Sequence, residues 1–553
     1  MLYRIARYYN TVKYLRPVQI IGQLLKAYIL KSKPAVKSPS VIAAPYVKTL
    51  IPALDLDEEY LSRFDIEQLM RGEFMLLGEA HQLDLYSWQV EASPLWRFNL
   101  HYFEHAIALA AKYRQTSHPK YYDKFKEIFR SWIVHNPVGT GDGWHPYTIS
   151  MRLPNLLICL DLFGEIFTVD TEFQTKAFQS IYVQYRSLIK RKETWQLGNH
   201  YFENLKTILF GSLMFDEPRV FEKHLRLFLR EVKEEILPDG VHFELSPMYH
   251  KIILEDIIRV TYWLRQMEKP QYKELLPAIQ KMVNALASIE KGMGKTPLFN
   301  DSGDGVAKDC AALLMAANDL FNITQNYSES FSASGYYKLY DGNIALMFDA
   351  GEIGPKYMAG HGHCDCLSFE LSVDNKPLFV NSGTYQYQGD KRKYFRSTEA
   401  HNTLTVGERE QSEYWGEHRV ARRVSNVKAE KNSQLITGSY QTYLGDTHTR
   451  MISLAEGVLT VLDSVVTAAP TTIHSYLHIT DNYEVVADDV DFKVLCSGHT
   501  VCTVTPVRAE YSIHTSGNLT NYAPRFGTLS HGICIEFRWL ADDRQHGYII
   551  QIH

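Results

Sequence analysis

Histidine, tyrosine and carboxylate side chains gather in four short stretches of this 553-residue chain. In the first stretch, Glu203 follows His200 by three positions, a spacing that puts an imidazole and a carboxylate on one face of a helix. Asn199, just before them, is also suited to cap that helix. In the second stretch, Tyr249 comes soon after Glu244, and a phenol can transfer protons when a neighbouring cation lowers its pKa. Both stretches are candidates for acid–base chemistry.

The other two stretches lie in the second half of the chain. His361 and His363 alternate with glycines, so on a strand both imidazoles would point to one side and could bind a metal ion or a substrate. Arg396 precedes His401 in a polar loop, where its guanidinium is suited to bidentate binding of a carboxylate. Asn381 lies between these two stretches and is placed to add a ligand near His363.

The elements that position these residues change type along the chain. From about residue 94 to 321, apolar residues recur at helical spacing, and breaks rich in Pro, Gly or Asp separate the segments. The predicted helices include 101–113, 122–134, 155–167, 173–191, 201–215, 220–236 and 248–267. Antiparallel helix pairs joined by short loops fit a solenoid or a closed toroid.

From about residue 336 the pattern becomes that of strands. Segments 344–348, 367–373, 378–380, 402–406, 458–466 and 548–552 alternate or are β-branched between turn residues. This pattern predicts an antiparallel β-sandwich. The expected domains are a basic N-terminal segment (1–45), a helical domain (46–335) and a β-sandwich domain (336–553).

The composition narrows the class of ligand. The net charge of −5 and the pI of about 6.5 argue against a nucleic-acid binder that works by phosphate neutralisation. Aromatic residues make up 12% of the chain, which fits sugar stacking in a carbohydrate cleft as well as a large core. The seven scattered cysteines are typical of free thiols in a reducing compartment.

The N-terminal segment is basic and amphipathic. Residues 1–30 carry five Lys or Arg among apolar residues, and they show neither a small-residue cleavage site nor an unbroken apolar span. One interpretation is a helix pair packed on the body of the protein. The other is peripheral contact with an anionic membrane.

At the four stretches the sequence resembles the heparinase II/III-like polysaccharide lyases, a superfamily that includes oligo-alginate lyases and is related to the dermatan sulfate epimerases. The resemblance runs from about Trp96 to Trp415 and rests on the order of the motifs. These are Asn199-His200, Tyr249 after Glu244-Leu245-Ser246-Pro247, His361-Gly362-His363, Asn381-Ser382-Gly383-Thr384, Arg396-Ser397-Thr398 and Ala400-His401-Asn402-Thr403. The resemblance implies an incomplete (α/α) toroid followed by an antiparallel β-sandwich, in agreement with the two patterns above.

The resemblance also implies roles. Asn199, His200 and His361 would surround and neutralise a uronate carboxylate, and Tyr249 would act as base, acid or both. Neutralisation matters because the C5–H of a uronate is too weakly acidic to ionise until donors stabilise the aci-enolate that forms. Loss of O4 then gives a 4,5-unsaturated sugar.

A zinc ion is the one cofactor that the resemblance implies, and no organic cofactor is expected. His363, His401 and an acidic residue at position 381 would bind it. Position 381 is Asn in this chain, which removes a charge and weakens the expected site. Asp365 is the candidate to compensate.

Further residues are predicted to contact substrate, from the early helices and from the four stretches. These are Trp96, Arg97, Asn99, His101, Trp144, Tyr147, Arg152, Glu203, Glu244 and Arg396.

Three functions fit these residues. A lyase would cleave a uronate-containing polysaccharide by β-elimination. A uronyl C5-epimerase would share the first half-reaction and needs a second proton donor, which His361 or His401 could supply. A glycan-binding or assembly protein would use the scaffold without catalysis.

The expected place of action is the bacterial cytoplasm, peripheral to the inner membrane. The sequence shows no cleavable signal and no membrane-spanning segment. This location would suit the production of capsule, O-antigen or exopolysaccharide. The identity of the uronate polymer stays open.

Overall fold

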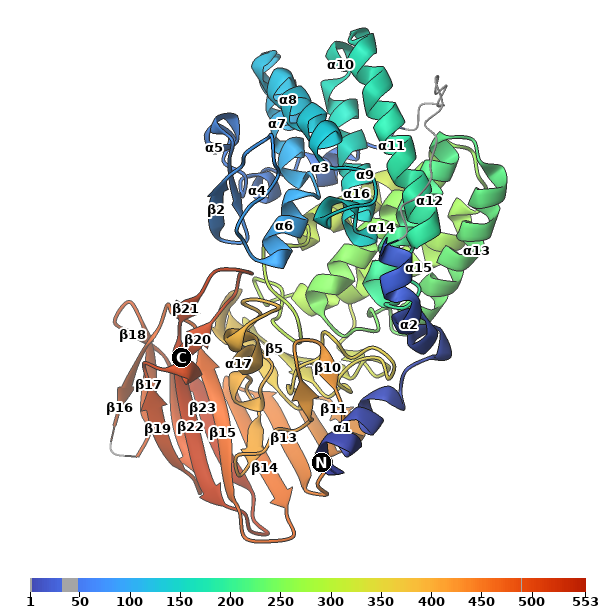
Figure 1. Ribbon diagram of the computed structural model, residues 1–553. Helices are drawn as coiled ribbons and strands as arrows, with labels where there is room; N and C mark the ends of the chain where they lie inside the picture. Colours follow the sequence, from blue (N-terminus) through green and yellow to red (C-terminus); the bar gives the residue numbers. More distant parts are fainter. Residues whose placement is uncertain (1, 32–47, 489) are drawn as a thin grey trace.

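The computed structural model describes residues 2–31, 48–488 and 490–553, and it has a helical half and a β half (Figure 1). Residues 32–45 of the predicted N-terminal segment lie outside the described residues. The order of helices first and strands second confirms the predicted α/α toroid followed by an antiparallel β-sandwich. No described helix is both long enough and apolar enough to cross a membrane.

The helical half consists of helix pairs around one apolar core. Its elements are α3 (Pro52–Asp55), α4 (Glu58–Leu61), α5 (Ile66–Arg71), the hairpin β1 (Glu73–Leu76) and β2 (Glu79–Gln82), α6 (Pro94–Leu100), α7 (Glu104–Thr116), α8 (Lys120–His135), η1 (Asp142–Trp144), α9 (Pro146–Phe163), α10 (Glu165–Val169), α11 (Thr171–Arg191), α12 (Gly198–Met214), α13 (Pro218–Glu235), α14 (Pro247–Gln266), α15 (Tyr272–Glu290) and α16 (Cys310–Phe321). Buried Leu, Ile, Phe and Trp side chains from α6 to α16 form a single cluster.

Most predicted helices agree with the structure to within a few residues. The segment 155–167 is an exception, because α9 ends at Phe163 and α10 begins at Glu165. Gly164 between them has φ +56°, a left-handed conformation that ends an α-helix. The pattern of apolar residues continues across this break, so the periodicity alone predicted one helix.

The β half consists of two packed antiparallel sheets. One has the strand order β11-β12-β13-β14-β23-β18-β17-β16, and the other has β19-β22-β15-β7-β6-β5-β4-β3 with β8 paired to β15. Their inner faces meet in one apolar core, in which the Phe537 and Tyr548 rings stack 4.5 Å apart. Alternate burial along β13 and β14 explains why the period-two pattern could be read from sequence.

The strands of these sheets are β3 (Ser330–Phe331), β4 (Tyr336–Asp341), β5 (Ile344–Asp349), β6 (Phe369–Val373), β7 (Lys376–Phe379), β8 (Leu404–Val406), β11 (Ser425–Asn432), β12 (Leu435–Gln441), β13 (Thr447–Ala455), β14 (Val458–Val466), β15 (Thr472–Ile479), β16 (Glu484–Ala487), β17 (Phe492–Cys496), β18 (His499–Val507), β19 (Glu510–His514), β22 (Ile533–Leu540) and β23 (His546–Ile552). Smaller elements are α17 (Asp390–Phe395), η2 (Thr398–Ala400), β9 (Tyr414–Trp415), β10 (Arg419–Val420), η3 (Asn518–Thr520), β20 (Asn521–Tyr522) and β21 (Ser530–His531).

Two N-terminal helices, α1 (Leu2–Val12) and α2 (Pro17–Lys31), lie across the junction of the two halves (Figure 1). Arg7 of α1 pairs with Glu413 at 2.8 Å, on the β side. Arg16, just before α2, pairs with Glu234 of α13 on the helical side. Helices α1 and α2 are therefore packed on the body of the protein.

Candidate active site

A cavity of about 1100 Å³ lies between the helical half and the β half. Helices α6, α9, α12 and α14 line one side, and the loops after β5 and β7 line the other. Seven of the residues predicted from sequence line it: Asn99, Tyr147, Asn199, His200, Glu203, Tyr249 and His361. Positions more than 150 residues apart in the chain therefore share one cavity.

Tyr249 lies in the first turn of α14, beside His361. Ser246 caps this helix, accepting a hydrogen bond from the Tyr249 N–H at 3.3 Å. The Tyr249 and His361 ring centroids are 4.1 Å apart, and the Tyr249 hydroxyl is 2.9 Å from that of Tyr387. Burial raises the pKa of Tyr249 well above its usual value of 10, so the phenol is neutral in the free protein. This direction is opposite to the lowered pKa expected from the sequence.

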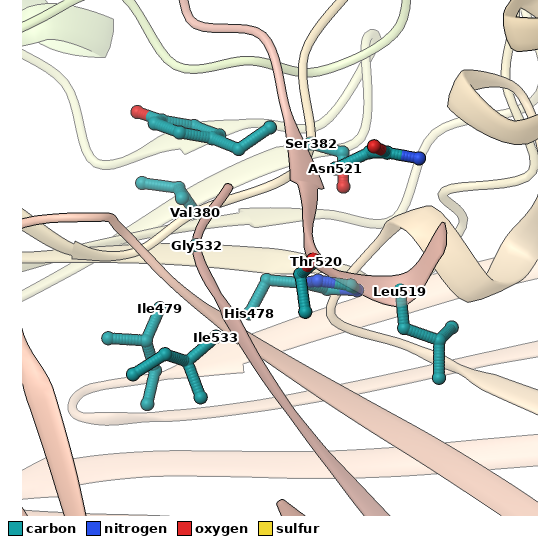
Figure 2. Close-up of a pocket in the computed structure, with 10 residues that line it drawn as sticks. Val380, Ser382, His478, Ile479, Leu519, Thr520, Asn521, Gly532 and Ile533 are labelled. Atoms are coloured by element: carbon teal, nitrogen blue, oxygen red, sulfur yellow. The ribbon is translucent and has the colours of Figure 1, made fainter. Parts of the chain in front are cut away.

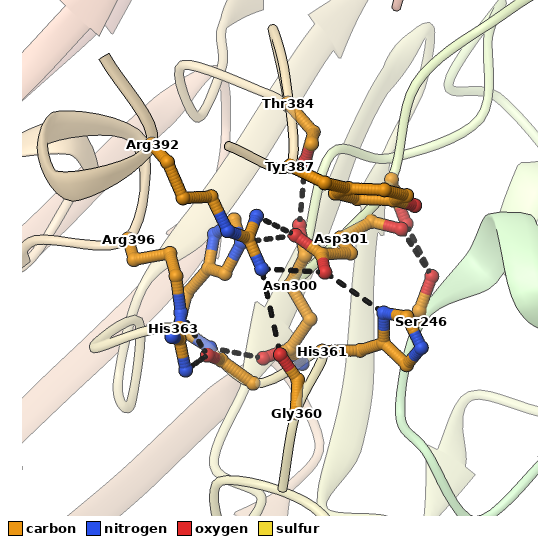
Figure 3. Close-up of polar contacts among 12 residues, drawn as sticks. Ser246, Asn300, Asp301, Gly360, His361, His363, Thr384, Tyr387, Arg392 and Arg396 are labelled. Carbon is orange, nitrogen blue, oxygen red and sulfur yellow. Dashed lines mark hydrogen bonds and ion pairs between the residues drawn. The ribbon is translucent and has the colours of Figure 1, made fainter. Parts of the chain in front are cut away.

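Asp301 connects His361, His363 and Arg392 (Figure 3). Its two carboxylate oxygens are 2.8 Å from His361 Nδ1 and 2.8 Å from His363 Nε2, and the Arg392 guanidinium binds both oxygens. Burial favours the neutral acid, but Arg392 and the two histidines outweigh it and hold the pKa of Asp301 well below its usual range. An ionised carboxylate therefore fixes the orientation of His361.

Asn199 and His200 begin α12 behind a tightly packed glycine. Gly198 has φ +53°, and a Cβ there would lie 2.1 Å from Met358 Cε, so only glycine fits. The helix is capped at Leu197, which corrects the expectation that Asn199 is the cap. Asn199 instead lies in the first turn and lines the cavity.

The carboxylate partner of His200 is Glu193. His200 Nδ1 is 3.1 Å from Glu193 Oε1, whereas Glu203 binds Lys206 at 2.6 Å. The predicted His200–Glu203 pair is therefore wrong, because the Lys206 ammonium takes the Glu203 carboxylate. Burial opposes ionisation of Glu193, but His200 outweighs it and the Glu193 pKa is lowered. The Tyr147 ring stacks on His200 at 4.1 Å.

Glu244 lies behind the cavity wall, under His361 and Asn199. Its Oε2 is 3.5 Å from His361 Nε2, and its Oε1 accepts a hydrogen bond from the Asn199 N–H at 3.4 Å. Burial raises the Glu244 pKa, and His361 opposes this shift. Glu244 thus supports two residues that line the cavity.

His363 and His401 are buried side by side, outside the cavity lining. His363 Nδ1 is 3.1 Å from His401 Nε2. Their other nitrogens contact oxygen atoms, Asp301 Oδ1 for His363 and the Ser397 carbonyl for His401. His401 was predicted to be catalytic at the cavity, and its full burial corrects that prediction.

The histidine pair fits part of a zinc site. Burial lowers the pKa of His363 to about 4 and that of His401 further, so both are neutral ligands at pH 7. Asn381 Oδ1 instead accepts hydrogen bonds from Ser368 and the Asn402 N–H, and its Nδ2 is buried without a partner. Within residues 2–31, 48–488 and 490–553, no three His, Cys, Asp or Glu are placed to hold a metal ion.

Three expectations about the β-domain loops need correction. His361 and His363 lie in a loop, and it is Asp301 rather than strand geometry that draws both imidazoles together. Asp365 accepts a hydrogen bond from the Asn300 N–H at 2.8 Å and makes no described contact with His363. Arg396 is fully buried and donates to the Gly362 and Glu417 carbonyls, so it holds loops together instead of binding a carboxylate.

Five residues predicted for the cleft wall belong to helix packing instead, and none of them lines the cavity: Trp96, Arg97, His101, Trp144 and Arg152. Arg152 is an example, because its guanidinium is fully buried and donates to Gln184 and to the His101 and Gly143 carbonyls. Trp96 and Trp144 donate to backbone carbonyls, and Arg97 pairs with Asp142.

Four residues of the site were not predicted from the sequence: Glu193, Asp301, Tyr387 and Arg392. Asp301 lies in the run Asn300-Asp301-Ser302-Gly303-Asp304, and the polar residues and glycine of this run are the sequence feature that could have indicated a functional loop. Tyr387 follows the Asn381–Tyr385 stretch by two positions. Glu193 and Arg392 stand next to lysines, and nothing in their local sequence distinguishes them from surface residues.

A second cavity, of about 10 Å³, lies between β15 and the η3–β20 segment and is lined by Val380, His478 and Ile533 (Figure 2). Its volume is at the lower limit for one water molecule. His478 Nε2 already contacts the Glu399 carbonyl at 2.9 Å. This cavity is a packing defect and not a ligand site.

The fold and the cavity define a class of protein: a toroid–sandwich protein whose interdomain cleft presents Tyr, His and Asn to a ligand. Comparison with known families agrees. The models "Heparinase II/III N-terminus" and "Heparinase II/III-like, C-terminal" match residues 60–328 and 324–538. The chain belongs to the heparinase II/III-like superfamily, which confirms the resemblance noted in the sequence.

Individual relatives are distant. The chain is 24% identical to a heparin-sulfate lyase of Pedobacter heparinus over 58% of its own length and 53% of that protein's. It is 26% identical to a heparin-sulfate lyase of Bacteroides stercoris over 59% and 55%. These alignments span about half the length of the curated relatives. A crystal structure of heparinase III superposes with a TM-score of 0.72 at 17% identity, covering 96% of this chain and 89% of that one, which shows a common fold.

Proposed function

We propose that this protein is a lyase that cleaves a uronic-acid-containing polysaccharide by β-elimination. The observation that carries the proposal is the convergence of Asn199, His200, Tyr249 and His361 on one cavity. Membership of the family and the similarity to heparin-sulfate lyases support it. The cavity of about 1100 Å³ is large enough for several sugar rings.

The first step is neutralisation of the uronate carboxylate. The Asn199 amide supplies N–H donors, and His361 is held between Asp301 and Glu244, which contact its two ring nitrogens. Donors fixed in this way stabilise the aci-enolate that forms when C5 loses its proton. They need no reorganisation during the reaction, because Asp301 and Glu244 already hold them.

Proton transfer then uses two groups. Because ionised Glu193 accepts the Nδ1 proton of His200, Nε2 carries a lone pair and removes the C5 proton. The electron pair left at C5 forms the C4–C5 double bond as the C4–O4 bond breaks. Tyr249 gives its proton to the departing O4, a role that suits a phenol kept neutral by burial. Use of Tyr249 as the base as well would require a phenolate in the free protein, before substrate binds, and burial opposes this.

The proposed substrate is an anionic polysaccharide. Cationic side chains line the cavity, among them Arg63, Lys308, Arg419 and Arg525. Lys308 is buried, and its ammonium lies 3.3 Å above the Tyr60 ring. These charges favour carboxylate or sulfate groups along the polymer.

The test is a screen of uronate polymers for an unsaturated product. A lyase generates a rise in ultraviolet absorbance, because the 4,5 double bond is conjugated with the carboxylate. If deuterium from solvent enters C5 of an intact polymer instead, the protein is an epimerase. If the polymer binds and neither change occurs, the glycan-binding alternative holds.

We also propose that His363 and His401 hold a weakly bound zinc ion. His363 Nδ1 and His401 Nε2 face each other, and the other ring nitrogen of each histidine contacts an oxygen atom. Both features support this proposal. When bound, the ion would brace the floor of the cleft. Asn381→Asp replaces the unpartnered Nδ2 with a carboxylate oxygen, so we expect it to tighten zinc binding at least tenfold.

Metal analysis of protein purified without chelator tests the zinc proposal. We expect zinc in the purified protein, its loss to chelator with a lower Tm, and better retention by Asn381→Asp. Metal-free protein whose Tm is the same with and without added zinc, in both forms, would contradict it.

We further propose that the protein works in the bacterial cytoplasm, peripheral to the inner membrane, in the production of capsule, O-antigen or exopolysaccharide. The seven free cysteines support a reducing compartment. The basic N-terminal segment supports contact with anionic lipid. Fractionation is the test, with part of the protein expected on membranes and released by high salt. Recovery mainly from periplasm or medium would contradict it.

A further inference from the structure

Helices α1 and α2 turn apolar side chains away from the protein. Eleven of the twenty-four exposed large apolar side chains in the described parts of the chain lie between Tyr3 and Tyr28. On α2, Ile21, Leu24, Leu25 and Tyr28 follow the spacing i, i+3, i+4, i+7, which forms one stripe along the helix. Leu24 is 80% exposed and Tyr28 is 78% exposed.

The opposite face of α2 is the one that packs on the body. Gln19 donates to the Tyr357 carbonyl at 3.2 Å, and Gly22 packs so closely on Trp195 that a Cβ would lie 2.3 Å from it. Arg191 of α11 donates to the Leu30 carbonyl at 2.6 Å. A helix docked only for stability would bury its apolar stripe. Here polar and backbone contacts anchor the helix, and the apolar stripe has no described cover.

Charge identifies the kind of surface that would cover the stripe. The chain has nine Lys and Arg and no Asp or Glu before Asp55, whereas the rest of it carries an excess of acidic residues. Arg4 and Lys13 are exposed beside the apolar side chains. A stripe of Leu, Ile and Tyr flanked by cations is complementary to the interface of an anionic bilayer, and helices of this kind lie in its plane. The segment also precedes the part matched by the family models, which begins at residue 60.

We infer that α1 and α2 form a platform that docks on an anionic membrane, with the α2 stripe inserted among the lipid headgroups. The inference rests on the proposed membrane contact and names the face that makes it. The same two helices line the cavity through Tyr8, Thr11, Gln19 and Gln23. Docking therefore places this side of the cleft at the bilayer, where the substrate is a polysaccharide attached to lipid or emerging at the membrane.

The experiment uses the full chain and lipid vesicles. We expect the wild-type protein to co-sediment with phosphatidylglycerol–phosphatidylcholine vesicles and at least tenfold less with pure phosphatidylcholine. The double variant Leu24→Glu, Tyr28→Glu should bind the anionic vesicles at least tenfold more weakly. The matched control is Val169→Glu, Val466→Glu, which changes two single apolar residues, each 69% exposed, outside the two platform helices. It should bind like the wild type.

Three outcomes would overturn the inference. In the first, the wild type binds both kinds of vesicle equally. In the second, the double variant binds anionic vesicles as strongly as the wild type does. In the third, sedimentation analysis shows that the wild type is a dimer and the double variant a monomer, because the stripe would then join two copies of the chain. Activity on a soluble uronate polymer separates this result from the proposed reaction. The α2 stripe is outside the cavity, so the double variant should keep wild-type turnover whenever the wild type has any.

Discussion

A single carboxylate organises the chemistry at the scale of residues. Asp301 holds His361, which lines the cavity, and His363, which forms the buried pair with His401. Arg392 keeps this carboxylate ionised. The orientation of His361 therefore depends on a residue that touches no substrate in the proposed mechanism.

We expect Asp301→Asn to lower kcat about 100-fold with little change in KM, because His361 loses its fixed orientation and its counterion. Asp301 is a positioning residue, so the loss should appear in kcat rather than in KM. Asp304→Asn is the control, since Asp304 lies on the same loop without contacting either histidine. Wild-type kinetics in Asp301→Asn would contradict this role.

The division of labour between His200 and Tyr249 predicts different responses to the leaving group. Tyr249→Phe should reduce turnover of a natural polymer about 100-fold or more, the scale of a lost general acid. A uronate with nitrophenolate at C4 needs no proton on departure, so it should restore most of the activity. His200→Gln should stay inactive on both substrates. If the nitrophenyl substrate rescues neither variant, Tyr249 has a role in proton abstraction.

Glu370 predicts how stability varies with pH. Burial raises its pKa to about 8, although it accepts hydrogen bonds from the Leu298 and Asn381 N–H groups. Between pH 4.5 and 8 the folded protein therefore holds a proton that the unfolded chain has released, and stability falls as pH rises through this range. Glu370→Gln keeps a side-chain oxygen that accepts these hydrogen bonds, but its amide does not titrate. We expect its Tm to exceed that of the wild type by a margin that grows from pH 5 to pH 8, and a constant margin would contradict this.

At the scale of elements, periodicity could predict helices and strands but not their contacts. The strand 458–466 agrees with β14 at both ends, because a buried face enforces strict alternation. The catalytic candidates were found as motifs within single loops, and Tyr249 and His361 do meet. Asp301 and Arg392 escaped prediction because they lie 91 residues apart in the chain. Glu193 is only seven residues before His200, but nothing in its local sequence marks it as the partner. Trp96 and Arg152 were predicted to contact substrate because they are large and carry N–H donors. Buried side chains that donate to backbone carbonyls have the same properties, and this is the role of both residues.

Lys338 of β4 joins the two halves at the end of α15. Its ammonium donates to the Ser288, Ile289 and Lys291 carbonyls, which the helix leaves unpaired. Burial lowers the pKa of Lys338 to about 7. Below this pH, where the amine is charged, Lys338→Met should lower the free energy of unfolding by about 2–3 kcal/mol, the scale of lost hydrogen bonds to a buried charged group. Lys281→Met, an exposed change on the same helix, should have little effect. Urea unfolding measures the free energy of unfolding of both variants. Equal values for Lys338→Met and Lys281→Met would show that β4 does not stabilise the end of α15.

At the scale of the whole molecule, the N-terminal helices connect the two domains that form the cleft. The Glu413 carboxylate accepts hydrogen bonds from Arg7 of α1 and from Arg422. Burial opposes ionisation of Glu413, but these hydrogen bonds outweigh it and hold the pKa at about 2. Glu413→Ala should free α1 and speed limited proteolysis within residues 2–31 about tenfold, as expected for loss of about 1.4 kcal/mol. Glu410→Ala is a neighbouring control that leaves Arg7 paired. Equal cleavage rates would show that other contacts hold α1.

The placement of α1 also sets an order of events during synthesis. Its partner Glu413 is 406 residues further along the chain. At about 5–20 residues per second, the ribosome needs roughly 20–80 s to make that stretch. The first helices therefore emerge long before their docking site exists, with their apolar side chains uncovered. The cleft also needs Arg525 and Phe526, so it is complete only after translation has passed well beyond the β9–β10 hairpin, and α1 is among the last elements to reach its final place.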